Sequence, residues 1–435
     1  MNLFSLLEGI EYRGNVSDME ISGITSDTRQ VKTGNLFICI KGFNFDGHTA
    51  AEKMLESGAV AVVVERDLGL KNQILVSDSR LAYGIICGNY FDNPARKMKM
   101  VAVTGTNGKT TCVFMLKQML EHMGHKTGLI STVQYEIGDR VLPSKNTTPD
   151  AYTFHSMLAK MYESGCEYVV MEASSHALDQ HRLASVIFEV GAFTNLTVDH
   201  LDYHKTMENY FEAKKKLFDI SKKAVVNYDD KYGRLLKEEL KEKAVTFSIS
   251  DDNADFTAKN IIMTAHGSKF AFVGKNVIAR METCIPGEYS VSNAMTAAVC
   301  CMQLGFKVDE IAESMKNQIG VPGRLEVIHG GPDFTILRDY AHAPDALEKM
   351  LSTMKKFAEN RLIVLFGCAG CRDRKKRRDM GRIVMENCDY AILTSDNPRE
   401  EDEMQIINDT IIGMDDKKRY EISPYYAGSG YRFGG

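Results

Sequence analysis

The sequence has no surplus of positive charge: 53 Lys and Arg residues stand against 58 Asp and Glu, which gives a net charge of -5 at pH 7. Proteins that bind nucleic acid normally carry the opposite balance, so this class is excluded as the expected function. No apolar run in the sequence approaches the length of about 18 residues that a membrane-spanning helix needs. The first residues of the sequence show no basic-then-apolar signal pattern. We therefore expect a cytoplasmic protein that binds neither nucleic acid nor membranes.

A metal-binding or disulfide framework of cysteines is missing as well. Most of the ten cysteines lie within apolar stretches, as Cys39, Cys300 and Cys301 do. In such stretches they behave as small buried hydrophobic residues that stay reduced. Cys368 and Cys371 form a single C-x-x-C, and no second pair follows at zinc spacing. The cysteines therefore favour a reducing compartment and do not indicate a zinc or redox centre.

The length allows about three domains of roughly 150 residues each, and the pattern changes in three blocks. Residues 1–95 contain short strand-like and helix-like segments and end at the turn Asn93-Pro94. Residues 96–323 and 324–435 each alternate apolar strands with helices, which is typical of α/β folds with a parallel sheet. We predict a small N-terminal α/β domain, a central P-loop domain with a mostly parallel sheet, and a C-terminal Rossmann-like α/β domain.

The strongest signal is a glycine-rich loop between an apolar strand and a helix. Its residues are Gly105, Thr106, Asn107, Gly108, Lys109, Thr110 and Thr111. Glycines let backbone N–H groups approach a phosphate, and the N-terminus of the following helix adds partial positive charge. Lys109 would contact the β- and γ-phosphates, and the Thr110 hydroxyl would bind Mg²⁺. Position 103 is valine where the G-x-x-x-x-G-K-[ST] pattern has glycine, but the strand, loop and helix together predict ATP binding.

Three further positions are ambiguous from the residues alone. Glu172 ends the strand-like segment EYVVME, where a carboxylate is either a Mg²⁺ ligand or simply solvated. His200 and His204 lie four residues apart, but no glutamate completes an H-E-x-x-H zinc motif. Lys214 begins a run of three lysines, and such a run on a helix normally forms a solvated face.

The string TGTNGKTT resembles the phosphate loop of the Mur ligases and of the related folylpolyglutamate synthetases, and similar segments extend the resemblance over nearly all 435 residues. Both families join a carboxylate to an amine at the expense of ATP. The resemblance implies Mg²⁺ at Thr110 and Glu172, and a second divalent-ion site that includes His200. It also implies that CO₂ carbamylates Lys214, whose product can hold a second Mg²⁺; this reaction requires a neutral amine with a depressed pKa.

The same resemblance places an acceptor substrate, a UDP-N-acetylmuramoyl-dipeptide. The segments S-D-T-R, N-T-T-P-D and S-S-H-A-L-D-Q-H-R are similar to substrate-binding motifs of the family. The implied contact residues are Ser26, Thr28, Asn146, Thr147, Thr148, Ser174, Gln180 and Arg182. The family usually has serine where Thr28 stands, but a hydroxyl is retained. Arg182 suits this task because a guanidinium can hold a carboxylate or phosphate through two hydrogen bonds.

Motifs for ATP and for the incoming amino acid follow, most of them in the third block. The resemblance implies contacts with the adenine and phosphates of ATP from Asn293, Arg324, Asp339 and His342. Arg372 aligns with the arginine that meets the amino acid's carboxylate, although Cys371 replaces the family's aspartate. The segment Asp396, Asn397, Pro398 and Arg399 resembles the D-N-P-R loop of enzymes that add meso-diaminopimelate. Arginine can bind that substrate's second carboxylate, which lysine does not have.

Taken together, the resemblance to the tripeptide synthetase branch predicts a monomeric ligase that uses ATP and Mg²⁺. It would add meso-diaminopimelate to UDP-N-acetylmuramoyl-L-alanyl-D-glutamate through an acyl phosphate, with Lys109, His200 and Lys214 as catalytic residues. Relatives continue with a G-K-G-H-E segment, whereas residues 423–435 show no family likeness, which predicts a truncated C-terminal domain. The alternatives are a lysine-adding relative, a folylpolyglutamate synthetase, and a non-catalytic fragment that binds ATP or a UDP-sugar.

Overall fold

The computed structural model divides into two compact units, each with its own hydrophobic core. Unit 1 comprises residues 1–262, 269–284 and 288–320, and unit 2 comprises residues 263–268, 285–287 and 321–435. The structure describes residues 1–42, 44–264, 267–328, 334–416 and 419–423. The three-domain division at residues 95 and 323 stays a prediction.

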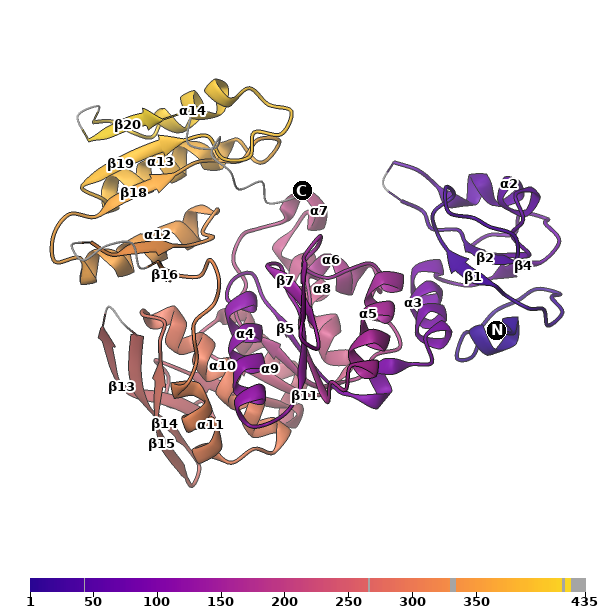
Figure 1. Ribbon diagram of the computed structural model, residues 1–435, viewed down its shortest axis with the longest axis horizontal. Helices are drawn as coiled ribbons and strands as arrows, with labels where there is room; N and C mark the ends of the chain where they lie inside the picture. Colours follow the sequence, from indigo (N-terminus) through magenta and orange to yellow (C-terminus); the bar gives the residue numbers. More distant parts are fainter. Residues whose placement is uncertain (43, 265–266, 329–333, 417–418, 424–435) are drawn as a thin grey trace. The chain divides into compact units, whose positions relative to one another are not determined.

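The N-terminal part of unit 1 folds around a four-stranded parallel sheet (Figure 1). Its strands, in spatial order, are β1 (Gly23–Thr25), β2 (Asn35–Ile38), β3 (Ala61–Val64) and β4 (Gln73–Leu75). Its helices are α1 (Leu3–Leu6), the 3₁₀-helix η1 (Gly47–Ala50), α2 (Ala51–Glu56) and α3 (Ser79–Tyr90). Side chains alternate between the faces of a strand. Leu36 and Ile38 therefore pack with α1 and α3, while Phe37 packs with α2 on the other face.

The rest of unit 1 is built on an eleven-stranded sheet with the order β15-β14-β13-β12-β11-β10-β5-β9-β6-β7-β8. The strands are β5 (Lys99–Thr104), β6 (Thr127–Ile130), β7 (Gln134–Ile137), β8 (Arg140–Pro143), β9 (Tyr168–Glu172), β10 (Phe188–Phe193), β11 (Ser221–Asn227), β12 (Ala244–Ser248), β13 (Phe256–Thr264), β14 (Gly267–Gly274) and β15 (Val277–Thr283). From β6 through β9, β5, β10, β11 and β12 to β13 every pairing is parallel. The predicted α/β class with a mostly parallel sheet is confirmed.

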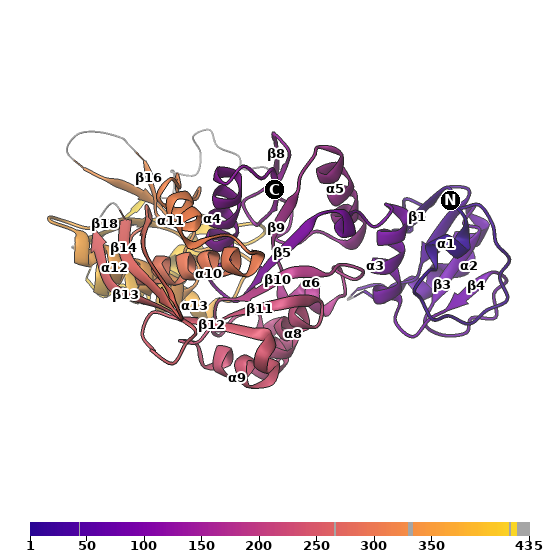
Figure 2. The same cartoon turned by 90° about the horizontal axis from the view of Figure 1, so that it is seen from below.

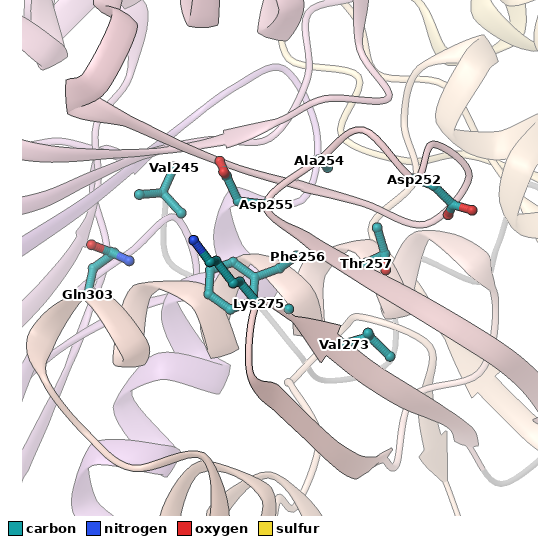
Figure 3. Close-up of a pocket in the computed structure, with 10 residues that line it drawn as sticks. Val245, Asp252, Ala254, Asp255, Phe256, Thr257, Val273, Lys275 and Gln303 are labelled. Carbon is teal, nitrogen blue, oxygen red and sulfur yellow. The ribbon is translucent and has the colours of Figure 1, made fainter.

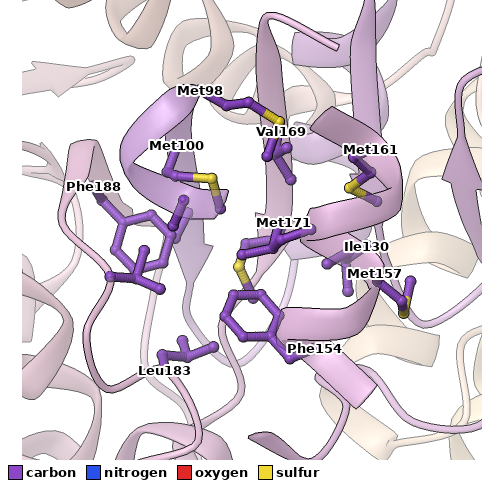
Figure 4. Close-up of a cluster of buried hydrophobic side chains, with 14 of the residues drawn as sticks. Met98, Met100, Ile130, Phe154, Met157, Met161, Val169, Met171, Leu183 and Phe188 are labelled. Atoms are coloured by element: carbon purple, nitrogen blue, oxygen red, sulfur yellow. The ribbon is translucent and has the colours of Figure 1, made fainter. Parts of the chain in front are cut away.

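Helices cover both faces of this sheet (Figures 1 and 2). They are η2 (Pro94–Lys97), α4 (Lys109–His122), α5 (Ala151–Glu163), α6 (Ser175–Asp179), α7 (Leu201–His204), α8 (Met207–Asp219), α9 (Lys231–Leu240), η3 (Lys241–Lys243), α10 (Glu288–Leu304) and α11 (Val308–Lys316). Met100 and Ala102 of β5 face a buried cluster that includes Phe154 of α5 and Leu217 of α8 (Figure 4). The alternate residues of β5 therefore face the side on which α4 packs together with α10 and α11.

The strand–helix alternation predicted for residues 96–323 does not hold everywhere. The strands β13, β14 and β15 follow one another without an intervening helix, and β7 and β8 form an antiparallel extension beyond β6. Along β13 the exposed and half-buried residues alternate after Ala258, so the outer part of this strand has one face open to solvent. A strand of this kind needs a helix on one face only.

Unit 2 contains a three-stranded parallel sheet in the order β18-β19-β20 and an antiparallel pair, β16 and β17. Its elements are β16 (Glu326–Ile328), β17 (Ile336–Arg338), α12 (Pro344–Phe357), β18 (Ile363–Phe366), α13 (Lys375–Asn387), β19 (Tyr390–Thr394), α14 (Glu403–Ile411) and β20 (Tyr420–Ser423). Leu351, Val364, Val384 and Ile407 belong to its core. Residues 424–435, which make up most of the segment 423–435 on which the predicted truncation rests, lie outside the described residues. Among the helices that the structure does describe, none is long and apolar enough to cross a membrane.

His155 of α5 provides a test of the core of unit 1. Its side chain is fully buried, and burial lowers its pKa from 6.5 to about 4. The unfolded chain therefore binds more protons than the folded protein between these pH values, so stability falls as the pH drops through this range. We expect His155→Leu to remove this part of the pH dependence, about 2 kcal/mol, from urea unfolding measured between about pH 7 and 4.5. The exposed His122→Gln is the control; parallel stability curves for wild type and His155→Leu would contradict the prediction.

Candidate active site

Four neighbouring parallel strands end at the same edge of the large sheet. β10, β5, β9 and β6 lie side by side, and their registers bring Phe193, Thr104, Glu172 and Ile130 to the strand ends. The glycine-rich loop leaves from β5 at this edge, and Glu172 is the last residue of the adjacent β9. Ligands of open α/β sheets bind outside the carboxyl ends of the strands. The fold thus places two of the predicted motifs where a ligand is expected.

Two glycines give the loop a shape that other residues could not adopt. Gly105 has φ of 149° and Gly108 has φ of 86°, both in a region that favours glycine. A Cβ atom at Gly105 would overlap Thr194 Oγ1, and one at Gly108 would overlap Asn293 Oδ1. Asn293 of α10, predicted to lie near ATP, is thereby brought directly against the loop.

The segment after β10 holds the loop through a set of hydrogen bonds. Thr106 N–H donates to the Asn195 carbonyl at 2.8 Å, and Asn107 N–H donates to Asn195 Oδ1 at 3.0 Å. Thr194 Oγ1 donates to the Asn107 carbonyl at 2.6 Å. These bonds hold the backbone of the loop, so little of its conformational freedom has to be lost when a ligand binds.

Lys109 is the first residue of α4, and its side chain bends back over the loop. Its Nζ donates to the carbonyls of Gly105 at 2.9 Å and Thr106 at 2.8 Å. The helix N-terminus adds partial positive charge at the same place. A cation, a helix start and glycines that admit close approach are the features that bind phosphate.

A chain of polar contacts links the start of α4 to the strand ends of β9 and β6. Glu172 is 1% exposed, and its Oε1 accepts hydrogen bonds from Thr110 Oγ1 at 2.9 Å and Thr132 N–H at 2.8 Å. Thr132 Oγ1 lies 3.2 Å from Glu172 Oε2 and 2.9 Å from Thr147 Oγ1. Glu172 is thus not a solvated strand end. A buried carboxylate and a hydroxyl at this distance offer the oxygen ligands that Mg²⁺ prefers, so the residues present fit the metal.

The residues predicted for the acceptor dipeptide gather beside Glu172. Thr148 Oγ1 donates to the Glu172 carbonyl at 2.7 Å and accepts from Ser174 N–H at 3.0 Å. Arg182 Nη1 donates to the Thr148 carbonyl at 3.0 Å, and its Nη2 donates to Gln180 Oε1 at 2.8 Å. Arg182 is half-buried rather than an ordinary surface arginine.

Two other predicted groups for the acceptor substrate lie at the ends of this region. Asn146 is exposed, and its backbone N–H donates to Tyr135 OH at 3.1 Å. Ser26 and Thr28 lie in the loop after β1 of the small sheet, where Ser26 shares a hydrogen bond with Tyr83. Asn146 therefore lies near the residues around Glu172, through its neighbour Thr147. Ser26 and Thr28 lie in a loop beside the separate four-stranded sheet.

Lys214 is buried rather than part of a solvated face. It is 2% exposed, its Nζ donates to the Gly105 carbonyl at 2.7 Å, and it lies 4.5 Å from the centre of the Tyr210 ring. Burial lowers the pKa of Lys214 well below its usual value, and the positive charge of Lys109 lowers it further. The amine as it stands does not fit a cation, but a neutral amine in this place is the form that reacts with CO₂.

His200 and His204 do not share a helix face as a metal-binding pair. His200 precedes the single turn of α7 with φ of 52°, and its ring contacts that of His176 at 5.1 Å between centres. His204 is buried and its Nε2 lies 2.9 Å from Ser175 Oγ. Burial lowers the pKa of His200, with Lys109 and Lys214 adding to the effect. Within the described residues, no three His, Cys, Asp or Glu side chains are grouped so that they could hold a metal ion.

In unit 2, the residues predicted to contact ATP form one small cluster. Asp339 accepts hydrogen bonds from Leu325 N–H at 2.9 Å and Ala341 N–H at 2.8 Å, and burial raises its pKa. The Arg324 guanidinium lies over the Tyr340 ring at 4.9 Å. His342 Nδ1 is 3.1 Å from the Tyr340 carbonyl. The turn from Asp339 to His342 is thus stabilised by the Asp339 carboxylate.

The loops that carry Arg372 and Arg399 follow β18 and β19, which are parallel neighbours. Both arginines are exposed, as are Asp396 and Asn397, while Pro398 is half-buried. Cys371, which replaces the family's aspartate, is exposed and adopts φ of 53°. The carboxyl ends of adjacent parallel strands meet at one edge, so the two arginine-bearing loops form a second candidate binding edge.

Several residues at these sites were missed in the sequence. Thr132 joins Glu172 to Thr147, Asn195 holds the phosphate loop, and Tyr210 covers Lys214. Asn195 could have been found as the polar residue that follows strand β10 at the ligand edge; Thr132 and Tyr210 carry no motif that indicates their role.

A pocket of about 560 Å³ lies elsewhere in unit 1 (Figure 3). Its lining comes from β12, β14, the segment before and into β13, and Gln303 of α10. It contains none of the predicted site residues, and its charged groups, Asp252, Asp255 and Lys275, are of mixed sign. The loop and strand-end chemistry, rather than this pocket, therefore defines the candidate site.

A glycine-rich loop from a central parallel strand into a helix, next to a buried carboxylate on the adjacent strand, defines a nucleotide-binding α/β enzyme. Three family models match the chain: the Mur ligase family catalytic domain over residues 20–101, the Mur ligase middle domain over residues 103–301, and the Mur ligase glutamate ligase domain over residues 323–424. The chain belongs to the Mur ligase family, and it is accordingly a ligase.

Curated relatives agree with this assignment. A Clostridium perfringens protein named UDP-N-acetylmuramoyl-L-alanyl-D-glutamate--2,6-diaminopimelate ligase is 42% identical over 424 residues, 94% of this chain and 87% of that protein. A Caldanaerobacter subterraneus protein of the same name is 41% identical over 413 residues, 94% of this chain and 85% of that protein.

Solved structures show the same fold. One ligase structure with the same name is 31% identical with a TM-score of 0.75, covering 99% of this chain and 92% of that one. The folylpolyglutamate synthase of Mycobacterium tuberculosis, at 16% identity and a TM-score of 0.64, covers 79% of this chain and 85% of its own, and shares the fold alone.

Proposed function

We propose that this protein is the ATP-dependent ligase that joins meso-diaminopimelate to UDP-N-acetylmuramoyl-L-alanyl-D-glutamate, a step of peptidoglycan precursor synthesis. The observation that carries the proposal is the buried Thr110–Glu172 pair beside the phosphate loop, in a chain 42% identical to a ligase of that name. A cytoplasmic, monomeric protein belongs to the same proposal.

The reaction has two steps and needs no protein nucleophile. The γ-carboxylate of the D-glutamyl residue attacks the γ-phosphorus of ATP, which forms an acyl phosphate and releases ADP. The amine of diaminopimelate then attacks the acyl carbon, an amide bond forms, the amine gives up its proton, and inorganic phosphate leaves. Lys109 and the loop N–H groups offset the charge on the phosphates, so positioning and electrostatics supply the rate.

Thr110 and Glu172 would hold Mg²⁺, with His200 and Lys214 at a second divalent-ion site. When bound, the metal would neutralise charge on the transferring phosphate. For Lys214 this role requires the carbamate, because an amine is not an oxygen ligand and its ammonium form repels cations. The buried amine of lowered pKa beside Gly105 supports carbamylation.

The residues around Glu172 would bind the acceptor. The Thr147 and Ser174 hydroxyls and the Arg182 guanidinium would provide donors for the UDP-linked dipeptide. Thr148, whose hydroxyl bonds Glu172 and Ser174, would hold this segment in place. Gln180 holds Arg182, and Asn146 adds an exposed amide next to Thr147. Ser26 and Thr28 would contact the uridine, and this part rests on the resemblance of the S-D-T-R segment.

Arg372 and Arg399 would recognise the two carboxylates of diaminopimelate, each through paired N–H donors. Asp396 would accept hydrogen bonds from the ammonium group at the distal end, while Asn397 and Pro398 shape the loop. Asn293 of unit 1, and Arg324, Asp339 and His342 of unit 2, would each contact ATP. The exposure of both arginines supports a role toward a ligand rather than in the core.

Phosphate release from ATP separates the proposal from its alternatives. We expect release with UDP-N-acetylmuramoyl-L-alanyl-D-glutamate plus meso-diaminopimelate, and little with lysine or with a folate plus glutamate. Release that depends on lysine or on a folate would establish the lysine-adding relative or the folylpolyglutamate synthetase instead. ATP binding without release under any of these conditions would establish the non-catalytic fragment.

Arg399→Ala tests the selection of the amino acid. We expect it to raise KM for meso-diaminopimelate by about 100-fold, because a charge-assisted bidentate pair to the second carboxylate is lost. KM for ATP should stay within about twofold. The exposed Arg361→Ala, in the same unit, is the control. An unchanged KM for diaminopimelate in Arg399→Ala would remove Arg399 from the amino-acid site.

A further inference from the structure

An ion-pair network around the buried Arg377 joins the two loops at the carboxyl ends of β18 and β19. At its centre, the Glu401 carboxylate lies 2.6 Å from Arg377 Nη2 and 3.0 Å from Arg377 Nη1. The same carboxylate accepts the backbone N–H of Cys371 at 2.9 Å. Glu401 lies two residues after Arg399, and Cys371 lies one residue before Arg372. One side chain of the second loop therefore holds the backbone of the first.

Close backbone packing fixes the register of these two loops. Gly370 N–H donates to the Asn397 carbonyl at 2.9 Å. A Cβ atom at Gly370 would overlap the Pro398 carbonyl oxygen, so the second loop passes directly over this glycine. Any shift of the Glu401 contact therefore moves the backbone next to both arginine positions.

The charges of the network balance internally. Arg377 is fully buried, and Asp409 Oδ2 lies 2.8 Å from its Nη1. Arg374 Nη2 lies 2.6 Å from Glu401 Oε1. The carboxylates of Glu401 and Asp409 thus offset the guanidinium groups of Arg377 and Arg374.

Arg372 and Arg399 remain outside this balance. Both are exposed, and neither side chain forms an ion pair or hydrogen bond with any residue that the structure describes. Two guanidinium groups on adjacent loops repel each other, and the balanced network leaves that repulsion without an opposite charge beside it. The arrangement suits a ligand that brings two carboxylates of its own.

We infer that Glu401 is a positioning residue that sets the separation of Arg372 and Arg399, and thereby selects an amino acid with two carboxylates over one with a single carboxylate. The inference rests on the proposed function, in which these arginines bind diaminopimelate. Bidentate recognition tolerates only small displacements, so the supporting contacts of an arginine decide how well it binds. Arg377 contributes by fixing the Glu401 side chain.

Glu401→Gln tests the inference, because it keeps the shape and one acceptor for Cys371 N–H but removes the charge. We expect KM for meso-diaminopimelate to rise about tenfold and the preference for diaminopimelate over lysine to fall by a similar factor. KM for ATP and for the UDP-linked dipeptide should stay within about twofold.

Asp409→Asn is the matched control. It removes a carboxylate from the same buried Arg377, but Asp409 otherwise bonds Gln405 and touches neither arginine loop. Both variants should lower the melting temperature, whereas only Glu401→Gln should raise KM for diaminopimelate. Equal effects of the two variants on that KM would show that the network acts on stability alone and would overturn the inference.

Glu401→Asp covers the case in which Glu401→Gln does not fold. It keeps the charge for Arg377 but shortens the side chain, so the Cys371 contact is lost and KM for diaminopimelate should still rise severalfold; a wild-type KM would overturn the inference. If the wild-type protein releases no phosphate with diaminopimelate, the proposed function itself is wrong. This outcome differs from an unchanged KM in the Glu401 variants, which would overturn only the role of Glu401.

Discussion

Lys109→Met is expected to lower kcat/KM for ATP by about 1,000-fold, as assayed by phosphate release. The lysine is held over the loop by the carbonyls of Gly105 and Thr106, at the first residue of α4. Methionine keeps the apolar stem but removes the only formal positive charge in residues 105–111. Charge shifts between the transferring and the leaving phosphate oxygens in the transition state, and Lys109 would lie beside both, so the loss should appear in kcat more than in the binding of ADP.

A separate measurement distinguishes a lost charge from a damaged loop. Lys109 also anchors the loop, so thermal unfolding should be recorded for the same sample. We expect the melting temperature to change by only a few degrees, about the effect of one or two hydrogen bonds. Lys71→Met, at an exposed lysine in the turn between β3 and β4, is the control. Activity above a tenth of wild type in Lys109→Met would contradict the assigned role.

Lys214→Ala is expected to lower kcat by about 1,000-fold, and formate or acetate should restore part of it. In the proposed carbamylation, Nζ attacks CO₂, an N–C bond forms and a proton leaves to solvent. The alanine variant lacks the resulting carboxylate group, and a small free carboxylate can occupy the space that the side chain leaves. Lys215→Ala is the control at the next residue, where the lysine pairs with Glu212 and Glu239 on the surface.

The carbamate itself can be observed in the wild-type protein. With ¹³C-labelled CO₂, we expect a carbonyl signal that is present in wild type and Lys215→Ala but missing in Lys214→Ala. The neutral amine required for this reaction follows from the burial of Lys214 and the nearby charge of Lys109. No labelled signal, together with no rescue by formate, would mean that Lys214 serves only to hold the Gly105 carbonyl.

The sequence was sufficient to predict the glycine-rich loop between β5 and α4 and the strand that ends at Glu172. The loop has a fixed spacing of glycines and a lysine between a strand and a helix, and parallel strands bring their carboxyl ends to one edge. The burial of Glu172 and Lys214 could not be predicted, because carboxylates at strand ends and lysine runs on helices are usually solvated. Their surroundings come from β6, β5 and the loop, which are distant in the sequence.

Other features depend on contacts that no local pattern records. Thr132 looks like any residue after a strand, and its role appears only when β6 is placed beside β9. Arg377 lies in a strongly basic segment of α13 that reads as a solvated face, yet it is fully buried because Glu401 and Asp409 neutralise it. The strands β13 to β15 depart from the alternation of strands and helices predicted for residues 96–323, because no helix separates them.

The close packing of the glycine-rich loop limits the mutations by which this protein could become resistant to an inhibitor that mimics a nucleotide. A side chain at position 105 would strike Thr194, and one at position 108 would strike Asn293. If a compound bound only the backbone of this loop, few substitutions within the loop would both weaken its binding and leave the loop intact. Resistance would have to arise in more permissive parts of the chain, or through raised expression or export.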